Sequence, residues 1–350
     1  MTTLNMTPKE AADKKRIKFA VIGMLWAWIS GVTTVTQGCI NTVISGGVEI
    51  GLSTTVATFV VAYAILGMND ILAGIFMIIN NMFHGRNLKE HARAVGTKLG
   101  NQMILGSFFG GACATGLVMT AYNLAGLTYT AILISTSPII TAIVGRILFK
   151  ETVNARMYAG IAIAVVGICL AGFAPPTGEV FPKFALGLLL AGLAPLFFTA
   201  EGMVATYATD LLDPNIGCAL FRGVASGIMI IIVGWIIGLL NGCGGLIFDV
   251  MGMILTTPTL LIGLICMAIA SCFSYMGTYV AFNMTGPTRC LAVVNTLPIW
   301  SIPVGLIFAA LGLQEYNVTG QAILGAFVIV VGILLVIANP KELVNLRDVE

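Results

Sequence analysis

The stretch "AYNLAGLTYTAILISTSP" at residues 121–138 returns in altered form as "AFNMTGPTRCLAVVNTLP" at residues 281–298. Six aligned positions are identical: Ala121/Ala281, Asn123/Asn283, Gly126/Gly286, Thr128/Thr288, Thr136/Thr296 and Pro138/Pro298. A second pair of stretches, residues 23–38 and 187–202, aligns at nearly the same offset and places Gln37 opposite Glu201. Two matches in the same order indicate that the chain contains an internal repeat.

The composition is that of a protein surrounded by lipid. The 350 residues are 58% hydrophobic and 9% charged, and the mean hydropathy is +1.00, whereas soluble proteins carry about 25% charged residues. Ten apolar runs are long enough, or nearly so, to span a bilayer: 18–40, 54–83, 101–122, 127–149, 156–173, 184–208, 216–240, 258–283, 288–311 and 319–338. Because these runs do not alternate with polar residues, they predict an all-α membrane protein and not a barrel.

The basic residues predict the orientation of these ten spans. With the amino terminus inside, every Lys and Arg except Lys183 and Arg222 falls in a cytoplasmic segment, out of 17 in the chain. The positive-inside rule favours this topology over its inverse. We therefore expect a multi-pass protein of the cytoplasmic membrane with both termini in the cytoplasm.

Each half of the chain holds five predicted spans, which is an odd number, so the second half must be inverted relative to the first. The predicted segments are a cytoplasmic amino-terminal segment (1–17), a first five-helix repeat (18–173), an external linker (174–183), a second five-helix repeat (184–338) and a cytoplasmic tail (339–350). Inverted repeats are typical of secondary transporters, whose halves enclose a site near the membrane midplane.

Residues 128–172, "TYTAILISTSPIITAIVGRILFKETVNARMYAGIAIAVVGICLAG", resemble the EamA-type repeat of the drug/metabolite transporter superfamily. The shared marks are a mid-helix proline, a short loop that carries Glu151, and a following helix punctuated by glycines. Residues 289–337 repeat the pattern, with Glu315 in the loop. The resemblance implies ten helices in two inverted five-helix repeats and the transport of small metabolites.

Polar and aromatic residues recur at helical spacing on several spans. On the first span, such residues lie within about 60° of arc, and the repeat-related face of the sixth span ends in Glu201. The expected substrate-binding residues are Trp26, Ser30, Thr33, Gln37, Ser135, Phe197, Glu201, Ser271, Tyr275, Tyr279, Asn295 and Trp300. The alternative for any single serine or threonine is packing with a hydrogen bond to its own backbone.

Two acidic residues, Asp70 and Glu201, fall inside apolar runs. An ionised carboxylate costs about 2.5–3.5 kcal/mol in the centre of a membrane helix on insertion scales, so such residues are usually functional. We expect both residues to take part in proton or cation coupling. The alternative is that either acid reaches the lipid headgroups or pairs with Arg222.

These features predict a secondary active transporter for a small polar or cationic metabolite, working by alternating access, with proton coupling as an open option. An amino-acid or drug exporter of the same superfamily is the nearest alternative, and an intramembrane enzyme or a membrane scaffold is the alternative of another class. The chain has only two histidines, His84 and His91, and no catalytic or nucleotide-binding motif. We expect no enzyme activity, metal, cofactor or nucleic acid, and leave monomer and homodimer open.

Overall fold

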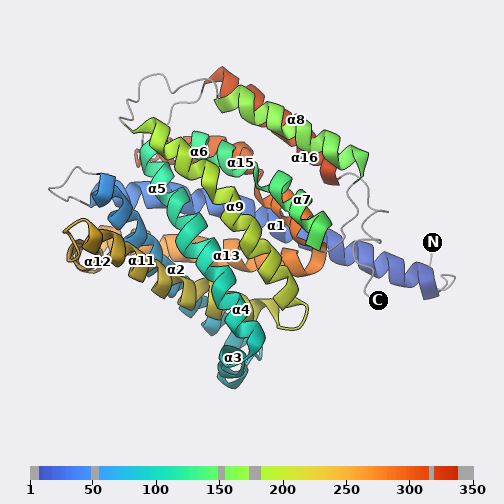
Figure 1. Ribbon diagram of the computed structural model, residues 1–350, viewed down its shortest axis with the longest axis horizontal. Coiled ribbons are helices and arrows are strands. Elements are labelled where there is room, and N and C mark those ends of the chain that lie inside the picture. The colour runs from blue at the N-terminus through green and yellow to red at the C-terminus, as the bar shows by residue number, and fades with distance from the viewer. Residues whose placement is uncertain (1–7, 49–54, 149–153, 173–182, 315–318, 338–350) are drawn as a thin grey trace.

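The computed structural model describes residues 8–48, 55–148, 154–172, 183–314 and 319–337, and these residues fold into helices joined by short turns (Figure 1). The predicted carboxyl-terminal tail and all of the predicted external linker except Lys183 lie outside the described residues, as do Glu151 and Glu315. No strand occurs in the described ranges. The predicted all-α architecture is confirmed for them.

The first half contains α1 (Pro8–Gly47), α2 (Thr55–Phe83), α3 (Leu88–Val95), α4 (Lys98–Ser107), η2 (Phe108–Thr115), α5 (Gly116–Ala125), α6 (Leu127–Ile134), α7 (Ser137–Leu148) and α8 (Ala155–Gly172). The second half contains α9 (Phe184–Thr209), α10 (Pro214–Gly217), η3 (Cys218–Ala225), α11 (Ser226–Leu240), α12 (Leu246–Thr256), α13 (Pro258–Thr285), α14 (Pro287–Val294), α15 (Leu297–Ala310) and α16 (Gly320–Ile337). Here η denotes a π-helical segment, and both η segments continue directly into α-helix at each end.

Within the described residues, 8 helices are long and apolar enough to cross a membrane. The expected fifth and tenth spans correspond to α8 and α16, each of 18 residues, in which the continuous apolar segments are shorter. These two helices lie side by side at one edge of the bundle (Figure 1). A Cβ on Gly167 would come within 2.8 Å of the Gly325 carbonyl oxygen, so glycine permits close backbone packing there.

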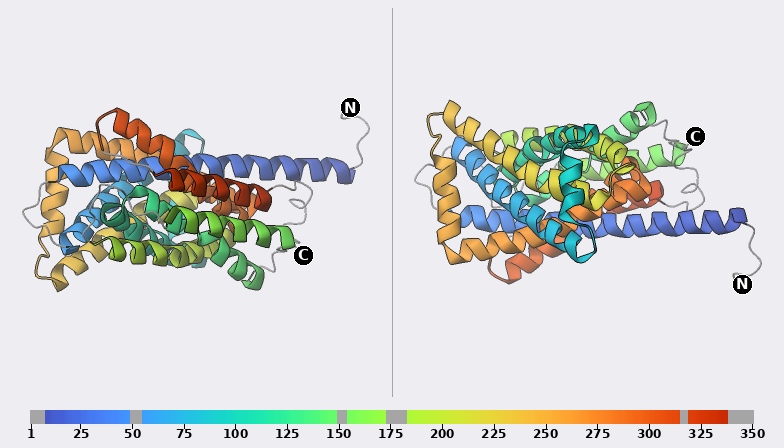
Figure 2. Two further views of the ribbon diagram at one scale, coloured as in Figure 1. Left: turned by 90° about the horizontal axis from the view of Figure 1, so that it is seen from above. Right: turned by 90° about the horizontal axis from the view of Figure 1, so that it is seen from below.

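Two helices differ from the sequence-based expectation. The first helix begins at Pro8, whereas its candidate membrane span begins at Ile17, so the described part of the predicted cytoplasmic segment continues the first helix. Helix α12 was not among the ten predicted runs. Its 11 residues extend about 16 Å, too short for a ~30 Å hydrocarbon core, and it lies across the ends of its neighbours (Figure 2).

The predicted fourth and ninth spans are each broken in the middle. Helix α6 ends and α7 begins around Ser135, and α14 and α15 are divided in the same way around Asn295. The prolines Pro138 and Pro298, expected within continuous helices, lie instead in the first turn after each break, where the missing N–H is not needed. The two breaks meet, because the Ser135 hydroxyl donates a hydrogen bond to the Asn295 carbonyl oxygen at 2.7 Å.

The turn after α2 is tied to the start of α10 by an ion pair. Arg86 Nε lies 2.7 Å from Asp213 Oδ2, and Asp213 Oδ1 accepts a hydrogen bond from the backbone N–H of Asn215 at 2.8 Å. Burial alone would raise the pKa of Asp213. The hydrogen bonds from Arg86 and Asn215 outweigh burial and hold the pKa of this carboxyl below its usual value.

Acid should remove the contribution of this ion pair to stability. Because the folded pKa of Asp213 lies below its ordinary value of 3.8, the contribution is fully present above that value and disappears as the pH falls through the folded pKa. The side chains are 28% and 34% exposed, so we expect less than about 1 kcal/mol. Melting temperatures of wild type and Asp213→Asn should differ slightly at neutral pH and converge as the pH falls below 3.8 and through the folded pKa. A difference that stays constant across this range would contradict the assignment.

Candidate functional site

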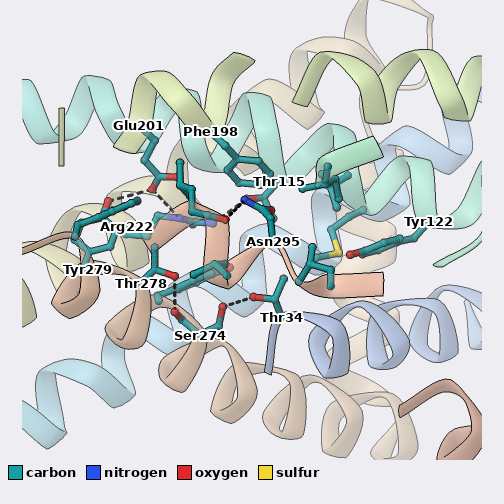
Figure 3. A pocket seen from close by; sticks show the side chains of 18 residues that line it. Thr34, Thr115, Tyr122, Phe198, Glu201, Arg222, Ser274, Thr278, Tyr279 and Asn295 are labelled. Carbon is teal, nitrogen blue, oxygen red and sulfur yellow. Dashed lines mark hydrogen bonds and ion pairs between the residues drawn. The ribbon is translucent and has the colours of Figure 1, made fainter. Parts of the chain in front are cut away.

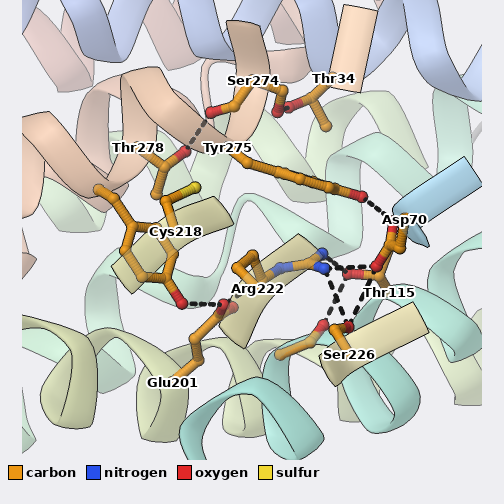
Figure 4. A network of polar contacts seen from close by, with 12 residues as sticks. Thr34, Asp70, Thr115, Glu201, Cys218, Arg222, Ser226, Ser274, Tyr275 and Thr278 are labelled. Carbon is orange, nitrogen blue, oxygen red and sulfur yellow. Dashed lines mark hydrogen bonds and ion pairs between the residues drawn. The ribbon is translucent and has the colours of Figure 1, made fainter. Parts of the chain in front are cut away.

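A buried cluster of three charged side chains joins Asp70 on α2, Glu201 on α9 and Arg222 on η3 (Figure 4). The Arg222 guanidinium lies between two carboxylates, with NH1 2.6 Å from Asp70 Oδ2 and Nε 3.2 Å from Glu201 Oε1. All three residues are buried, and Asp70 is fully inaccessible. One guanidinium thus faces two acids, so the cluster carries a net negative charge when both are ionised.

Asp70 is surrounded by hydrogen-bond donors. Besides Arg222, its carboxylate accepts from the Tyr275 hydroxyl at 2.6 Å, from Asn69 Nδ2 at 3.0 Å and from the Ser226 hydroxyl at 3.1 Å. Each of the two carboxylate oxygens therefore accepts from two donors. The alternative that Asp70 pairs with Arg222 is therefore what the structure shows.

Two residues expected on the substrate-facing surface support this cluster instead. Gln37 Nε2 donates to the Tyr275 hydroxyl at 3.0 Å, and the Ser271 hydroxyl donates to Asn69 Oδ1 at 3.0 Å. The Arg222 guanidinium carbon lies 3.9 Å from the centre of the Tyr275 ring, a cation–π contact. The polar stripes of the first and eighth spans therefore orient the charged groups through a second layer of hydrogen bonds.

Both π-helical segments contribute to the cluster. Arg222 lies on η3, and its NH2 donates to Thr115 Oγ1 on η2 at 2.9 Å. Thr115 in turn donates to the Gly110 carbonyl oxygen at 2.6 Å, five residues back. Such π-helical turns are rare and are found frequently at functional sites.

Glu201 differs from Asp70 in having fewer partners. Within the described chain, its hydrogen-bonding and ionic contacts are with Arg222 and with the Tyr279 hydroxyl, at 3.1 Å, and both are made by Oε1. Glu201 also lines a cavity, whereas Asp70 does not. Of the two acids, Glu201 is the one in contact with space that a proton or ligand could enter.

Gly110 creates the space in which the Glu201 carboxylate sits. A Cβ at Gly110 would overlap Glu201 Oε2, so we expect Gly110→Ala to displace the carboxylate and to cost about 1–3 kcal/mol through overpacking. Gly192→Ala is the matched control, because it lies on the same helix as Glu201 and a Cβ added there would have nothing within 4 Å. The melting temperature should fall for Gly110→Ala and not for Gly192→Ala. Equal melting temperatures for the two variants would contradict the packing argument.

The cavity beside the cluster has a volume of about 70 Å³ (Figure 3). Its polar side consists of Glu201, Arg222 and Tyr279, and Tyr122 lies on the opposite side. The Tyr122 hydroxyl is buried and has no hydrogen-bond partner among the described residues. This volume suits a few water molecules and is well below the 300–1,000 Å³ typical of ligand sites, so a metabolite could enter only if the surrounding helices moved apart.

One wall of the cavity is the contact between α1 and α13. Thr34 shares a hydrogen bond of 2.7 Å with Ser274, and Ser30 shares one of 2.7 Å with Thr278. Thr34, Ser274 and Thr278 line the cavity. Thr33, the residue expected there, donates instead to the Ile29 carbonyl oxygen at 2.9 Å on its own helix.

Of the remaining residues expected to bind substrate, some line the cavity and others do not. Asn295, Tyr275 and Tyr279 line the cavity, whereas Ser135 contacts it only through its bond to the Asn295 backbone. Phe197 stacks on Phe109, and its neighbour Phe198 is the phenylalanine that lines the cavity.

The two tryptophans expected in the site lie apart from this cavity. Trp300 packs edge-on against Trp28, with ring centres 5.5 Å apart. Trp26 borders a separate cleft between α1, α2 and α13.

Sequence reasoning named Arg222 only as an alternative partner of the two acids, and it did not single out Thr115 or Tyr122. An arginine inside an apolar run was the available signal for Arg222, since such a residue needs a buried partner. Thr115 and Tyr122 carry no comparable signal, because threonine and tyrosine are common in membrane helices.

Three comparisons with known proteins bear on this geometry. The family model described as "EamA-like transporter family" matches residues 21–173, so the resemblance predicted from the sequence is confirmed there. No curated protein matches the chain. Among 28 matching chains of solved structures, one crystal structure with 13% identity and a TM-score of 0.57 covers 88% of this chain and 95% of its own. That likeness shows the fold alone.

Together with the 8 apolar helices, the family match makes this a multi-pass membrane protein.

Proposed function

Since residues 21–173 match the model of the EamA-like transporter family, we propose that the protein is a secondary active transporter that moves a small polar or cationic metabolite by alternating access. The observation that carries this proposal is Glu201, a buried acid that borders the central cavity while sharing Arg222 with Asp70. Buried acids of this kind in transporters bind protons or cations.

The architecture that we propose for this transport is ten spans in two inverted five-helix repeats. Equivalent elements support it: Gly126 and Gly286 have φ of +81° and +76°, which glycine adopts readily, and each precedes a helix that breaks eight or nine residues later. The contacts are also reciprocal, because α1 packs on α13 while α9 packs on α4, η2 and α5. Two such halves could rock about the meeting point of Ser135 and Asn295.

The charges of the cluster support competition between a proton and a cationic substrate. With Asp70 ionised and paired to Arg222, the charge of the cluster depends on Glu201. Protonation of Glu201 makes the cluster neutral, and its deprotonation leaves one negative charge that a cation can balance. Binding of a proton therefore opposes binding of a cationic substrate, which is the requirement for exchange between substrate and proton.

We propose that the protein resides in the cytoplasmic membrane with both termini in the cytoplasm. The distribution of basic residues supports this orientation, because the turn after α2, with Arg86, and the segment that follows it carry four basic residues and the external linker carries only Lys183. A cysteine introduced at Asn87, which is exposed, should react with a membrane-impermeant reagent only after the cells are permeabilised.

A flux assay tests the proposed function. Ligands are first selected from amines, amino acids and nucleotides by their effect on the melting temperature of the purified protein. The selected compound is then loaded into proteoliposomes, and its movement is measured with and without an imposed pH gradient. We expect the gradient to accelerate net movement against the substrate gradient. Absence of protein-dependent flux for every selected ligand would contradict the proposal.

A further inference from the structure

A second cleft, separate from the charged cluster, lies between α1, α2 and α13 near the carboxyl-terminal end of α2. Its volume is about 620 Å³, which is within the range of small-molecule sites. None of the residues that form the cluster of Asp70, Glu201 and Arg222 lines it. The cleft is therefore distinct from the proposed transport site.

Most of the cleft is apolar. Phe76 and Met77 of α2 form one wall, and Ile269, Phe273 and Met276 of α13 form the other. Met77 is buried, whereas Ile269 and Phe273 are 47% and 50% exposed, on the outer surface of a membrane helix. A wall of this composition, open on a surface that faces lipid, suits a hydrocarbon chain.

One end of the cleft is polar and basic. Asn80, His84, Arg86 and Asn215 line it. The ion pair with Asp213 uses Nε of Arg86, so it does not use the two terminal nitrogens of the guanidinium. His84 Nδ1 lies 2.8 Å from the Asn80 carbonyl oxygen and must donate to it, which directs Nε2 away from its own helix.

The surroundings of this polar end are also positive. The segment from residue 84 to residue 100 holds Arg86, Lys89, Arg93 and Lys98 against the single acid Glu90. The α1 residue at this cleft is Trp26, and tryptophan favours the level of the lipid headgroups. An apolar channel that ends in a basic group at headgroup level matches an anionic lipid.

We infer that the cleft binds one anionic diacyl phospholipid. An acyl chain lies between the α2 and α13 walls, and the phosphate group contacts the Arg86 guanidinium. Arg86 is shared with Asp213, so the Asp213 carboxylate competes with the phosphate for the guanidinium. This site is independent of the transported substrate, and its failure would leave the proposed function unaffected.

Native mass spectrometry of the purified full chain tests the inference with three probes. Phosphatidylglycerol supplies an anionic headgroup and two chains, phosphatidylcholine supplies the same chains with no net charge, and inorganic phosphate supplies the anion alone. We expect one tightly retained phosphatidylglycerol, weaker retention of phosphatidylcholine and no retention of phosphate. Equal retention of the two lipids, or retention of phosphate alone, would overturn the inference.

Two variants should change the affinity in opposite directions. Arg86→Gln should weaken phosphatidylglycerol binding about fivefold, the ratio that one basic residue near a membrane surface supplies. Asp213→Asn should strengthen it, because the competing carboxylate is lost while an amide oxygen can still cap α10. A loss of binding in both variants would show that the ion pair only holds the fold and would overturn the assigned contact.

Two further variants separate the site from general effects. Arg146→Gln removes an exposed arginine on α7 that bonds to Tyr158, and it should leave lipid retention unchanged. Met276→Trp fills the cleft and should reduce retention of both lipids, while its melting temperature in detergent confirms that it folds. Unchanged retention in the Met276→Trp variant would place the bound lipid elsewhere.

Discussion

Replacing Arg222 with glutamine is expected to lower the stability of the protein by about 3–5 kcal/mol, the usual loss when one partner of a buried ion pair is removed. The substitution leaves Asp70, which is fully inaccessible, without its cation, and removes the only cation that contacts Glu201 in the described structure. Hydrogen bonds from Tyr275 and Ser226 to Asp70 would remain, but they cannot balance its charge. The melting temperature in detergent should fall sharply.

A compensating variant shows whether an unpaired charge causes this loss of stability. Adding Asp70→Asn to Arg222→Gln removes the unpaired carboxylate charge and should recover much of the lost stability. Asp70→Asn alone should cost less than Arg222→Gln, because Arg222 keeps Glu201 as a partner. Arg146→Gln, at an exposed arginine, is the control and should change stability by less than about 0.5 kcal/mol. If the double variant is as unstable as Arg222→Gln, packing and not charge balance is the reason for the loss.

Replacing Glu201 with glutamine should leave the fold intact and reduce transport strongly. The amide oxygen can still accept from Tyr279 and Arg222, and Asp70 still balances the guanidinium. The repeat-related position already carries an amide, Gln37. Interactions with charged groups contribute about 1.5–3 kcal/mol, so loss of the carboxylate should slow flux of a cationic substrate about ten- to a hundredfold.

The pH profile of flux distinguishes coupling from simple binding. If the proposed coupling through Glu201 holds, wild-type flux should depend on pH and flux through Glu201→Gln should not. Melting temperature is measured on the same preparation, so that a folding defect is recognised. Glu90→Gln, at an exposed acid on α3, is the matched control and should retain the wild-type profile. Normal flux with an unchanged pH profile in Glu201→Gln would remove this residue from the mechanism.

The amino-acid sequence by itself determined the class of the protein and the extent of most helices. The run predicted at 54–83 corresponds to α2 at Thr55–Phe83, and the run at 184–208 to α9 at Phe184–Thr209. Transfer of a helix into lipid depends on the summed hydrophobicity of its own residues, so local composition is sufficient for this prediction. The same reasoning does not detect α12, which is too short to span and lies across other helices.

Only the tertiary structure decided which polar residues meet. Thr34 and Phe198 line the cavity in place of Thr33 and Phe197, because one residue along a helix turns a side chain by about 100° and the rotation of each helix is set by its neighbours. The η2 and η3 segments change that rotation further, and no pattern in the sequence predicts them. Arg222 could be recognised from the sequence as needing an acid. That it is shared depends on the tertiary structure, which places one Asp70 oxygen 2.6 Å and one Glu201 oxygen 3.2 Å from its guanidinium nitrogens.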